Sequence, residues 1–245
     1  MTPMMITVFA ILGALAGLAV RSTVFSLSVP AERPPRTDCP RCHAAILGHG
    51  HRTEEVLVWG RCRRCHSRIA PPPLLVEVPL GVVFALLAYR QSDVWAVLAF
   101  CWLSAHGAAA ALVDLAVRRV PNVLTLSSYI GVVAFLAVQT ASGHDWAGLL
   151  KAVIGGIGLA VFYLVLAVAS RGGLGLGDVK LAAGLGTALS WIGITALVAG
   201  TVLGLLLAGA TGLAAILMGR LRWHQQFPFG PCLVLGALLI LLVLS

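Results

Sequence analysis

Long apolar stretches dominate the chain from one end to the other. Apolar runs of 16 residues or more cover 4–20, 74–89, 94–113, 123–141, 147–169 and 230–245, and the only charged residues within them are Glu77 and Lys151. A further uncharged run from 181 to 218 would form one helix roughly 57 Å long, nearly twice the hydrocarbon thickness of a bilayer. We therefore expect this run to divide near Ser190–Gly193 into two helices. The pattern predicts an all-α, polytopic membrane helix bundle of about eight spans.

The composition supports the same class. Of the 245 residues, 59% are hydrophobic and 11% are charged, and the mean hydropathy is +0.97. Soluble domains are about 45–50% apolar and about 25% charged. These values exclude a soluble two-domain enzyme, a secreted disulfide-rich mini-protein and a disordered chain.

The basic residues predict the orientation in the membrane. The chain has 17 Lys and Arg against 9 Asp and Glu. If the polar segment 21–73 is cytoplasmic and the spans alternate, fifteen of the 17 fall on the cytoplasmic side, and only Arg90 and Lys151 face outward. Such an asymmetry is typical of membrane topology, so we attribute the net charge of +8 to topology and not to nucleic-acid binding. Both termini are then expected to face outward.

The segment 21–73 differs from the rest because it is polar, Arg-rich and carries two C-x-x-C pairs separated by nineteen residues. Four thiolates at this spacing suit a tetrahedral zinc ion with no open coordination position, which indicates a structural site. Two disulfides are the alternative, but a cytoplasmic segment keeps its thiols reduced. The predicted ligands are Cys39, Cys42, Cys62 and Cys65, any of which could be replaced by a histidine among His43, His49, His51 and His66.

Two aspartates lie at the ends of apolar runs. Asp114 directly follows one run, and Asp178 directly precedes another. Two spans separate them, so both lie at the cytoplasmic face, where ionisable groups at membrane depth usually serve a function. Each also has a local explanation, since Asp114 could pair with Arg118 and Asp178 could be a helix N-cap. Together they predict a two-carboxylate site in which one group stays protonated, as aspartic proteolysis requires.

The residues around Asp178 have two interpretations. Gly175 and Gly177 have no side chains, so an extended substrate backbone could approach Asp178 closely, although the same glycines could merely interrupt the helix. Lys180 could hold negative charge on a neighbour or anchor the helix in the headgroup region.

Four motifs in order make the sequence resemble the bacterial prepilin peptidases, or type IV leader peptidases, which are membrane aspartic proteases of the GxGD class. Asp114 followed by Pro121 and Asn122 is similar to the family's D-x6-P element, and residues 175–181, GLGDVKL, match its G-x-G-D-x-K. The two cysteine pairs and the PFGP stretch at 228–231 complete the set.

The resemblance implies an activity and a location. Members of the family cut the basic leader of prepilins and pseudopilins at the cytoplasmic face of the bacterial inner membrane, and many then methylate the new N-terminus with S-adenosylmethionine. Asp114 and Asp178 fall on the two catalytic positions of the family, and the cysteine loop is linked to its bifunctional members. We expect a first span at 1–20, a zinc-binding loop domain at 21–73 and a protease domain at 74–245, embedded in membrane lipid.

Other functions remain open at this point. The chain could be a leader peptidase without methyltransferase activity, or a proton-coupled transporter in which Asp114 and Asp178 are relay groups. A non-catalytic assembly factor with a zinc loop would tolerate loss of both aspartates but not of the cysteines.

Overall fold

The protein was analysed as a computed structural model, which describes residues 2–30, 33–46, 59–143, 145–170, 174–219 and 228–244. Two of the alternative zinc ligands, His49 and His51, lie outside these ranges. The described part of the chain is all-α, and five of its helices (α1, α3, α4, α5 and α7) are long and apolar enough to cross a membrane. The helices are α1 (Pro3–Leu27), α2 (Glu77–Arg90), α3 (Val94–Val117), α4 (Asn122–Gly143), α5 (Trp146–Ala169), α6 (Leu176–Ile192), α7 (Ile194–Leu217) and α8 (Gly230–Leu244).

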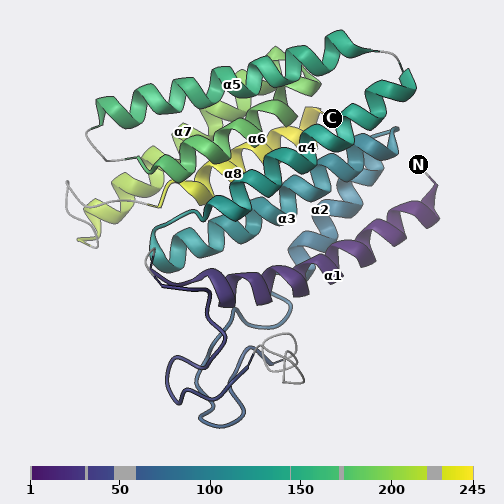
Figure 1. Ribbon diagram of the computed structural model, residues 1–245. Helices are drawn as coiled ribbons and strands as arrows, with labels where there is room; N and C mark the ends of the chain where they lie inside the picture. Colours follow the sequence, from purple (N-terminus) through teal and green to yellow (C-terminus); the bar gives the residue numbers. More distant parts are fainter. Residues whose placement is uncertain are drawn as a thin grey trace.

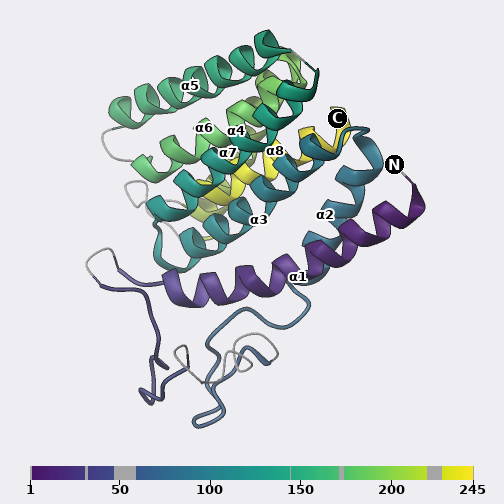
Figure 2. The same cartoon turned by 45° about the vertical axis from the view of Figure 1, so that its right-hand side comes forward.

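Helices that follow one another in the chain pack as antiparallel pairs: α1 with α2, α3 with α4, α5 with α6 and α7 with α8. Helix α3 is central and also packs on α1, α2, α6 and α8. The two termini lie at one end of the bundle, and the cysteine-containing segment between α1 and α2 lies at the other (Figures 1 and 2). We call this segment, 28–76, the cysteine module, and the end of the bundle that carries it the module side.

The expected division of the run 181–218 is confirmed. Helix α6 ends at Ile192, and α7 begins at Ile194. Gly193 between them has a φ of 152°, which a residue with a side chain rarely adopts.

Asp93 begins α3 by accepting hydrogen bonds from the backbone N–H groups of Trp95 and Ala96, as expected for an N-cap.

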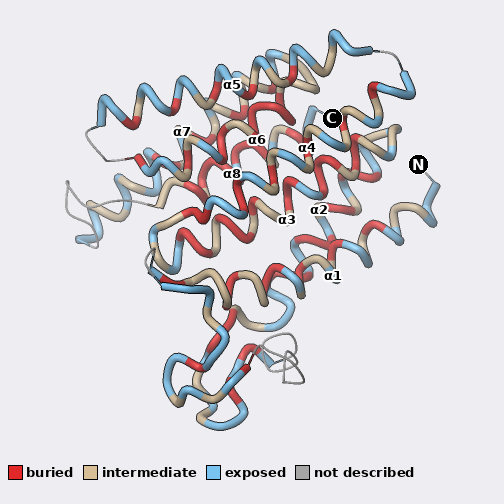
Figure 3. The backbone as a smooth tube through the Cα atoms, viewed as in Figure 1, coloured by how far each residue is buried: buried red, intermediate tan, exposed pale blue. Residues whose placement is uncertain are grey.

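Small residues bring the helices into close contact, as expected for packing in lipid. On α1, a Cβ atom added at Gly13 would lie 2.5 Å from the carbonyl oxygen of Leu80 on α2. On α8, one added at Gly236 would lie 2.5 Å from the backbone nitrogen of Gly204 on α7. Burial is concentrated on the inner faces of α3, α6 and α8 (Figure 3), while large apolar side chains on the outer faces are exposed, as expected for helices that contact lipid.

A buried ion pair joins α1 to α2 directly beneath the cysteine module. Nη1 of Arg21, which is 0% exposed, donates to Oε1 of Glu77 at 2.7 Å. Nη2 of the same guanidinium would lie 2.9 Å from a Cβ atom added at Gly60 of the module. Arg21 therefore contacts both the partner helix and the module.

Breaking this pair from one side is expected to destabilise the protein. The variant Glu77→Ala removes the carboxylate that is paired with the buried Arg21 guanidinium, which costs about 3–5 kcal/mol in comparable cases. The free energy of unfolding of the purified protein measures this effect. The double variant Arg21→Met/Glu77→Leu removes both charges and is expected to recover most of the loss. A Glu77→Ala variant as stable as the parent would contradict this role for the pair.

Candidate active site and metal centre

The fold brings the two predicted aspartates to the same side of the bundle. Asp114 lies in the last turn of α3, and Asp178 lies in the first turn of α6, whose N-cap is Gly175. Both side chains are nearly inaccessible, at 4% and 5% exposure. The two carboxyls are close enough to interact electrostatically. Both lie on the module side, as the even number of helices between them predicts.

A third segment, the start of α8, closes the space between the two carboxyls. The backbone N–H of Gly230 donates to Oδ2 of Asp114 at 3.1 Å. A Cβ atom added at Gly230 would lie 3.1 Å from this oxygen and 3.4 Å from Oδ1 of Asp178. Both carboxyls therefore face one point, which only a residue without a side chain leaves clear.

The PFGP stretch explains why Gly230 is the donor. The first N–H groups of a helix have no partner within the helix. Pro231 has no N–H, and the N–H groups of Cys232 and Leu233 bond to the carbonyl oxygen of Phe229. The amide of Gly230 is thus directed at Asp114. In the sequence this stretch indicates only a family resemblance, and its contact with the aspartates was not predicted.

Neither an Asp114–Arg118 ion pair nor an N-cap at Asp178 is observed among the described residues. Within the described ranges, the salt bridge that forms is Arg21–Glu77, and it does not involve Asp114. Arg118 contacts Asp114 through the main chain, where the N–H of Arg118 donates to the carbonyl oxygen of Asp114 at 2.7 Å. Asp178 is not the N-cap of α6. Its Oδ1 atom has no hydrogen-bond partner among the described residues. Both side chains are therefore placed for something other than capping or a local ion pair.

Two of the predicted supporting residues connect the start of α6 to the α3–α4 connection and the start of α4. Nζ of Lys180 donates to Oδ1 of Asn122 at 2.8 Å, which ties α6 to the start of α4. A Cβ atom added at Gly177 would lie 2.8 Å from Cβ of Val120 in the α3–α4 connection. Gly177 thus serves close packing in this structure. The Cβ position of Gly175 is 3.3 Å from Oδ2 of Asp178.

One buried residue near the site was not predicted. Tyr163 on α5 is 1% exposed and lies close enough to Asp178 for an electrostatic interaction. Its hydroxyl has no partner within the part of the chain that the structure describes. A tyrosine inside an apolar span carries no sequence signal that separates it from a packing residue.

The four predicted cysteines form one cluster. Their sulfur atoms all lie within 4.8 Å of one another, with Sγ atoms 3.6 Å apart for Cys39–Cys65 and 3.7 Å apart for Cys42–Cys62. All six cysteines of the chain are free thiols. Ligands about 2.3 Å from a tetrahedral zinc ion would be about 3.8 Å apart. The cluster can hold a metal ion, and neither His43 nor His66 belongs to it.

The two C-x-x-C pairs are local copies of one turn. In the first pair, the N–H of His43 donates to the oxygen of Cys39, and the N–H of Cys39 donates to the oxygen of Ala44. The second repeats this pattern with His66, Cys62 and Ser67. The two histidines have φ values of 54° and 55°. Each pair is followed by a histidine, and the motif C-x-x-C-H can also attach haem c. The four sulfur atoms lie close together, which favours one shared metal ion over haem attachment.

Hydrogen bonds favour the thiolate form at Cys39 and Cys65. At Cys42 the backbone hydrogen bond to Ala44 lowers the pKa, but burial and hydrogen bonds to the other three cysteines outweigh it and raise the pKa to about 12. Burial raises the pKa of Cys39, but hydrogen bonds from the backbone of Arg41 and Cys42 and from the Ser67 hydroxyl outweigh it and lower the pKa to about 6. The Ser67 hydroxyl is also the main cause of the lowered pKa of Cys65, whose sulfur lies 3.0 Å from it. Thiolates are the form that binds metal.

Replacing Ser67 by alanine is expected to weaken zinc binding about tenfold, within the range found when a hydrogen-bond partner of a metal ligand is lost. The dissociation constant, obtained by competition with a chromophoric chelator, measures the effect. Thr37→Ala is the matched control, because its hydroxyl contacts the exposed Asp38 and no cysteine. Equal zinc affinity in the Ser67→Ala variant and the parent would refute this role.

The site has the groups that aspartic hydrolysis needs. A carboxylate can take a proton from water, and a neighbouring carboxylic acid can donate one to a carbonyl oxygen. Burial of both groups disfavours two negative charges at close range. The arrangement at Asp114, Asp178 and Gly230 is therefore suited to adding water to a carbonyl group.

Comparison with known proteins places this site in a family. A family model described as type IV leader peptidase family matches residues 98–245, which include both aspartates and Gly230. The chain is 33% identical to the prepilin leader peptidase/N-methyltransferase of Burkholderia pseudomallei strain 1026b over 82% of its own length. It spans 65% of the length of that relative.

Two further relatives show the same similarity. The chain is 34% identical to the type 4 prepilin-like proteins leader peptide-processing enzyme of Escherichia coli O78:H11, covering 83% of this chain and 74% of that protein. It is 26% identical to the prepilin leader peptidase/N-methyltransferase of Neisseria gonorrhoeae, covering 98% and 91% of the two chains. No solved structure matches the chain significantly.

Proposed function

Because the chain belongs to the type IV leader peptidase family, we propose that it is a membrane aspartic endopeptidase that removes the leaders of type IV prepilins and pseudopilins. The observation that carries the proposal is the convergence of Asp114 and Asp178 on one point beside Gly230. A water molecule activated there attacks the carbonyl carbon between the leader and the mature protein.

The hydrogen bonds suggest how the two aspartates divide the work. The Gly230 N–H donates to Asp114, and a hydrogen bond from an N–H group favours the ionised form of a carboxyl. In the proposed mechanism, Asp114 is the carboxylate that takes a proton from water. Asp178 is the acid, and it donates its proton to the carbonyl oxygen as the water oxygen bonds to carbon. Asp114 then gives its proton to the leaving amine as the C–N bond breaks, and Asp178 takes a proton from a hydroxyl of the tetrahedral intermediate as the carbonyl re-forms.

The proposed setting is the bacterial inner membrane, crossed about eight times. The shorter helices α2, α6 and α8 complete the bundle beside the five long ones. In this arrangement residues 1–20 are the first span, 21–73 the loop domain and 74–245 the protease domain. The module side faces the cytoplasm, where the basic residues gather. A prepilin then lies with its apolar helix in lipid while its leader reaches the site from the cytoplasm.

Zinc and S-adenosylmethionine are the proposed cofactors. Cys39, Cys42, Cys62 and Cys65 would hold zinc as a structural ion that folds the module. The names of two relatives include N-methyltransferase, which supports methylation of the new N-terminus as a second activity. Among the described residues, the cavity between the module and the bundle presents Arg36 and Arg68 but no carboxylate to pair with the cationic methyl donor, so we assign no residue to that cofactor.

Cleavage by the purified protein tests the proposal. The chain, reconstituted in liposomes with a prepilin, is expected to release the leader, and mass spectrometry of the mature product shows the cut and any added methyl group. Uncut prepilin, under conditions in which a homologous peptidase cuts it, would overturn the peptidase assignment. Proton flux across the same liposomes, coupled to a solute, would favour a transporter instead. A cut but unmethylated product would leave a monofunctional peptidase.

A further inference from the structure

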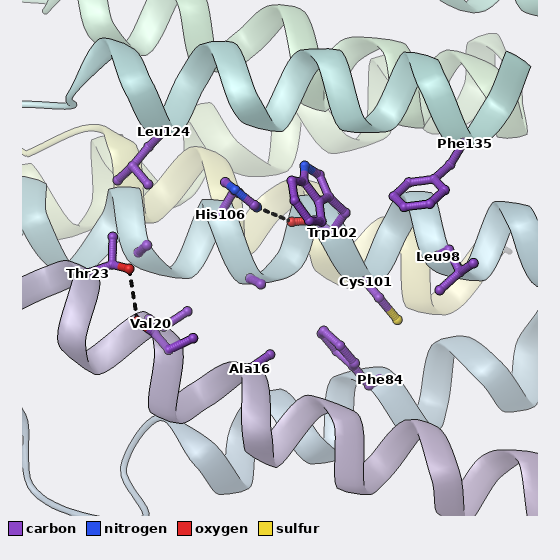
Figure 4. A pocket seen from close by; sticks show the side chains of 13 residues that line it. Ala16, Val20, Thr23, Phe84, Leu98, Cys101, Trp102, His106, Leu124 and Phe135 are labelled. Atoms are coloured by element: carbon purple, nitrogen blue, oxygen red, sulfur yellow. Dashed lines mark hydrogen bonds between the residues drawn. The ribbon is translucent and has the colours of Figure 1, made fainter. Parts of the chain in front are cut away.

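An apolar groove runs along α3 on the outer side of the bundle. Helices α1 and α4 flank α3 without packing closely on each other. Between them lies a cavity of about 350 Å³, lined on α1 by Ala16, Ala19 and Val20 and on α3 by Cys101, Ala105 and Ala109 (Figure 4). Trp102 in its wall is 37% exposed. The groove therefore opens sideways to the surroundings of the bundle, which in a membrane are acyl chains.

The polar groups in this groove are already bonded within the protein. Nδ1 of His106 lies 2.9 Å from the carbonyl oxygen of Trp102, and its Nε2 lies 3.1 Å from Oγ of Ser127. The indole N–H of Trp102 donates to the carbonyl oxygen of Ser127. The Thr23 hydroxyl donates to the oxygen of Ala19. The described residues that line the groove thus present no unpaired polar side chain, and the groove fits an alkyl chain.

The same faces of α1 and α3 continue into a second cavity of about 540 Å³ on the module side. Val24 and Phe25 follow the groove residues on α1, and Ser28 comes directly after its end, while Leu112, Ala116 and Val117 follow them on α3. Each set begins within one helical turn of the last groove residue on its helix. An elongated molecule can therefore occupy both cavities.

The second cavity differs from the first because it contains positive charge. Arg36 and Arg68 of the cysteine module line it, and its lining contains no carboxylate among the described residues. Nη2 of Arg36 donates to the carbonyl oxygen of Ser28, and its guanidinium lies 5.8 Å from the Phe25 ring centroid, which holds the guanidinium at the mouth of the cavity. Guanidinium groups bind phosphate through paired hydrogen bonds, and basic pockets beside membrane helices bind anionic headgroups.

We propose that these two cavities form one binding site for an anionic phospholipid, with an acyl chain between α1 and α3 and the phosphate between Arg36 and Arg68. The lipid then joins the cysteine module to the bundle, since the two arginines belong to the module and the chain-binding groove belongs to the helices. This lipid site is independent of the proposed cleavage reaction.

The lipid site and the aspartates lie on opposite sides of α3. The groove positions 105, 109, 112 and 116 recur at intervals of three and four residues along one helix face. Asp114 is two residues from both 112 and 116, which places it on the far side of the helix. A substrate helix in the groove would therefore be separated from the dyad by α3, which favours a lipid as the occupant.

Native mass spectrometry of the full chain in mild detergent tests this site. Phosphatidylglycerol is expected to bind at least about tenfold more tightly than zwitterionic phosphatidylcholine, given the attraction of anionic lipids to each basic side chain. Arg36→Gln/Arg68→Gln is expected to abolish this preference. The control Arg33→Gln/Arg64→Gln removes two exposed charges of the same module that do not line the cavity, and it is expected to retain the preference.

A second pair of variants tests the groove without changing charge. Ala19 is exposed and lines the groove, so Ala19→Phe is expected to fill it and lower the affinity for phosphatidylglycerol about tenfold. Leu15→Phe adds a ring at an exposed position outside the groove and is expected to have no effect. The proposal is overturned by equal binding of both lipids, by an equal loss in the control variants, or by displacement of the lipid by S-adenosylmethionine, which would assign the cavity to the methyl donor.

Discussion

Asparagine in place of Asp114 or Asp178 is expected to lower the rate of leader cleavage at least about a thousandfold, within the range that general acid–base groups contribute. An amide has nearly the shape of a carboxyl, but it can neither take a proton from water nor donate one as an acid. In the proposed mechanism each aspartate supplies one half of this proton transfer, so neither variant is expected to retain a working pair. The measurement is the single-turnover rate of prepilin cleavage in liposomes.

The bundle is expected to remain folded in both variants, because a neutral side chain replaces a buried ionisable one. Thermal unfolding and retained zinc content check this point. Asp145→Asn is the matched control, since Asp145 caps α5 at the opposite end of the bundle and asparagine caps a helix about as well as aspartate. Cleavage at the parent's rate by either active-site variant would exclude that residue from the dyad.

The second large effect is expected at Gly230. In Gly230→Ala, the new Cβ would lie 3.1 Å from Oδ2 of Asp114 and 3.4 Å from Oδ1 of Asp178, at the point proposed for the attacking water. The backbone N–H remains, so the loss arises from displaced reacting groups, and misplacement on this scale costs about a hundredfold in rate. Gly230→Val is expected to abolish cleavage.

A glycine elsewhere separates this effect from a general response to added bulk. A Cβ atom at Gly209 or Gly212 on α7 would meet nothing within 4 Å, and alanine is favoured over glycine inside a helix. Gly209→Ala and Gly212→Ala are therefore expected to cleave at the parent's rate. An unchanged rate in Gly230→Ala would show that the start of α8 does not border the reacting atoms.

The features that the sequence predicted are those governed by local pattern. Apolar run length predicted the helices, and the length of the run 181–218 required a break, which lies at Gly193. Cysteine spacing predicted the cluster because two C-x-x-C turns, which carry four thiolate ligands between them, are typical of a zinc site. Counting spans placed Asp114 and Asp178 on one side, since that inference needs only the number of crossings.

The features that were missed depend on contacts between distant segments. Gly230 meets Asp114 across 116 positions of sequence, and no periodicity reports which helix ends are neighbours. Lys180 donates to Asn122 and not to an aspartate, because the packing of α4 on α6 decides which acceptor lies within its reach. Glu77 gave no signal at the start of an apolar run, and its partner Arg21 becomes evident only when α1 and α2 pack together.

The most direct test of the shared site is a double-mutant cycle on the two carboxyls. Single-turnover cleavage rates are measured for the parent, for Asp114→Asn, for Asp178→Asn and for the protein carrying both changes. Groups that act as one unit lose their function together, so the doubly substituted protein is expected to cut within about threefold of the slower single variant. A rate reduced by the product of the two separate losses would show that the aspartates act independently, and it would contradict a common water molecule between them.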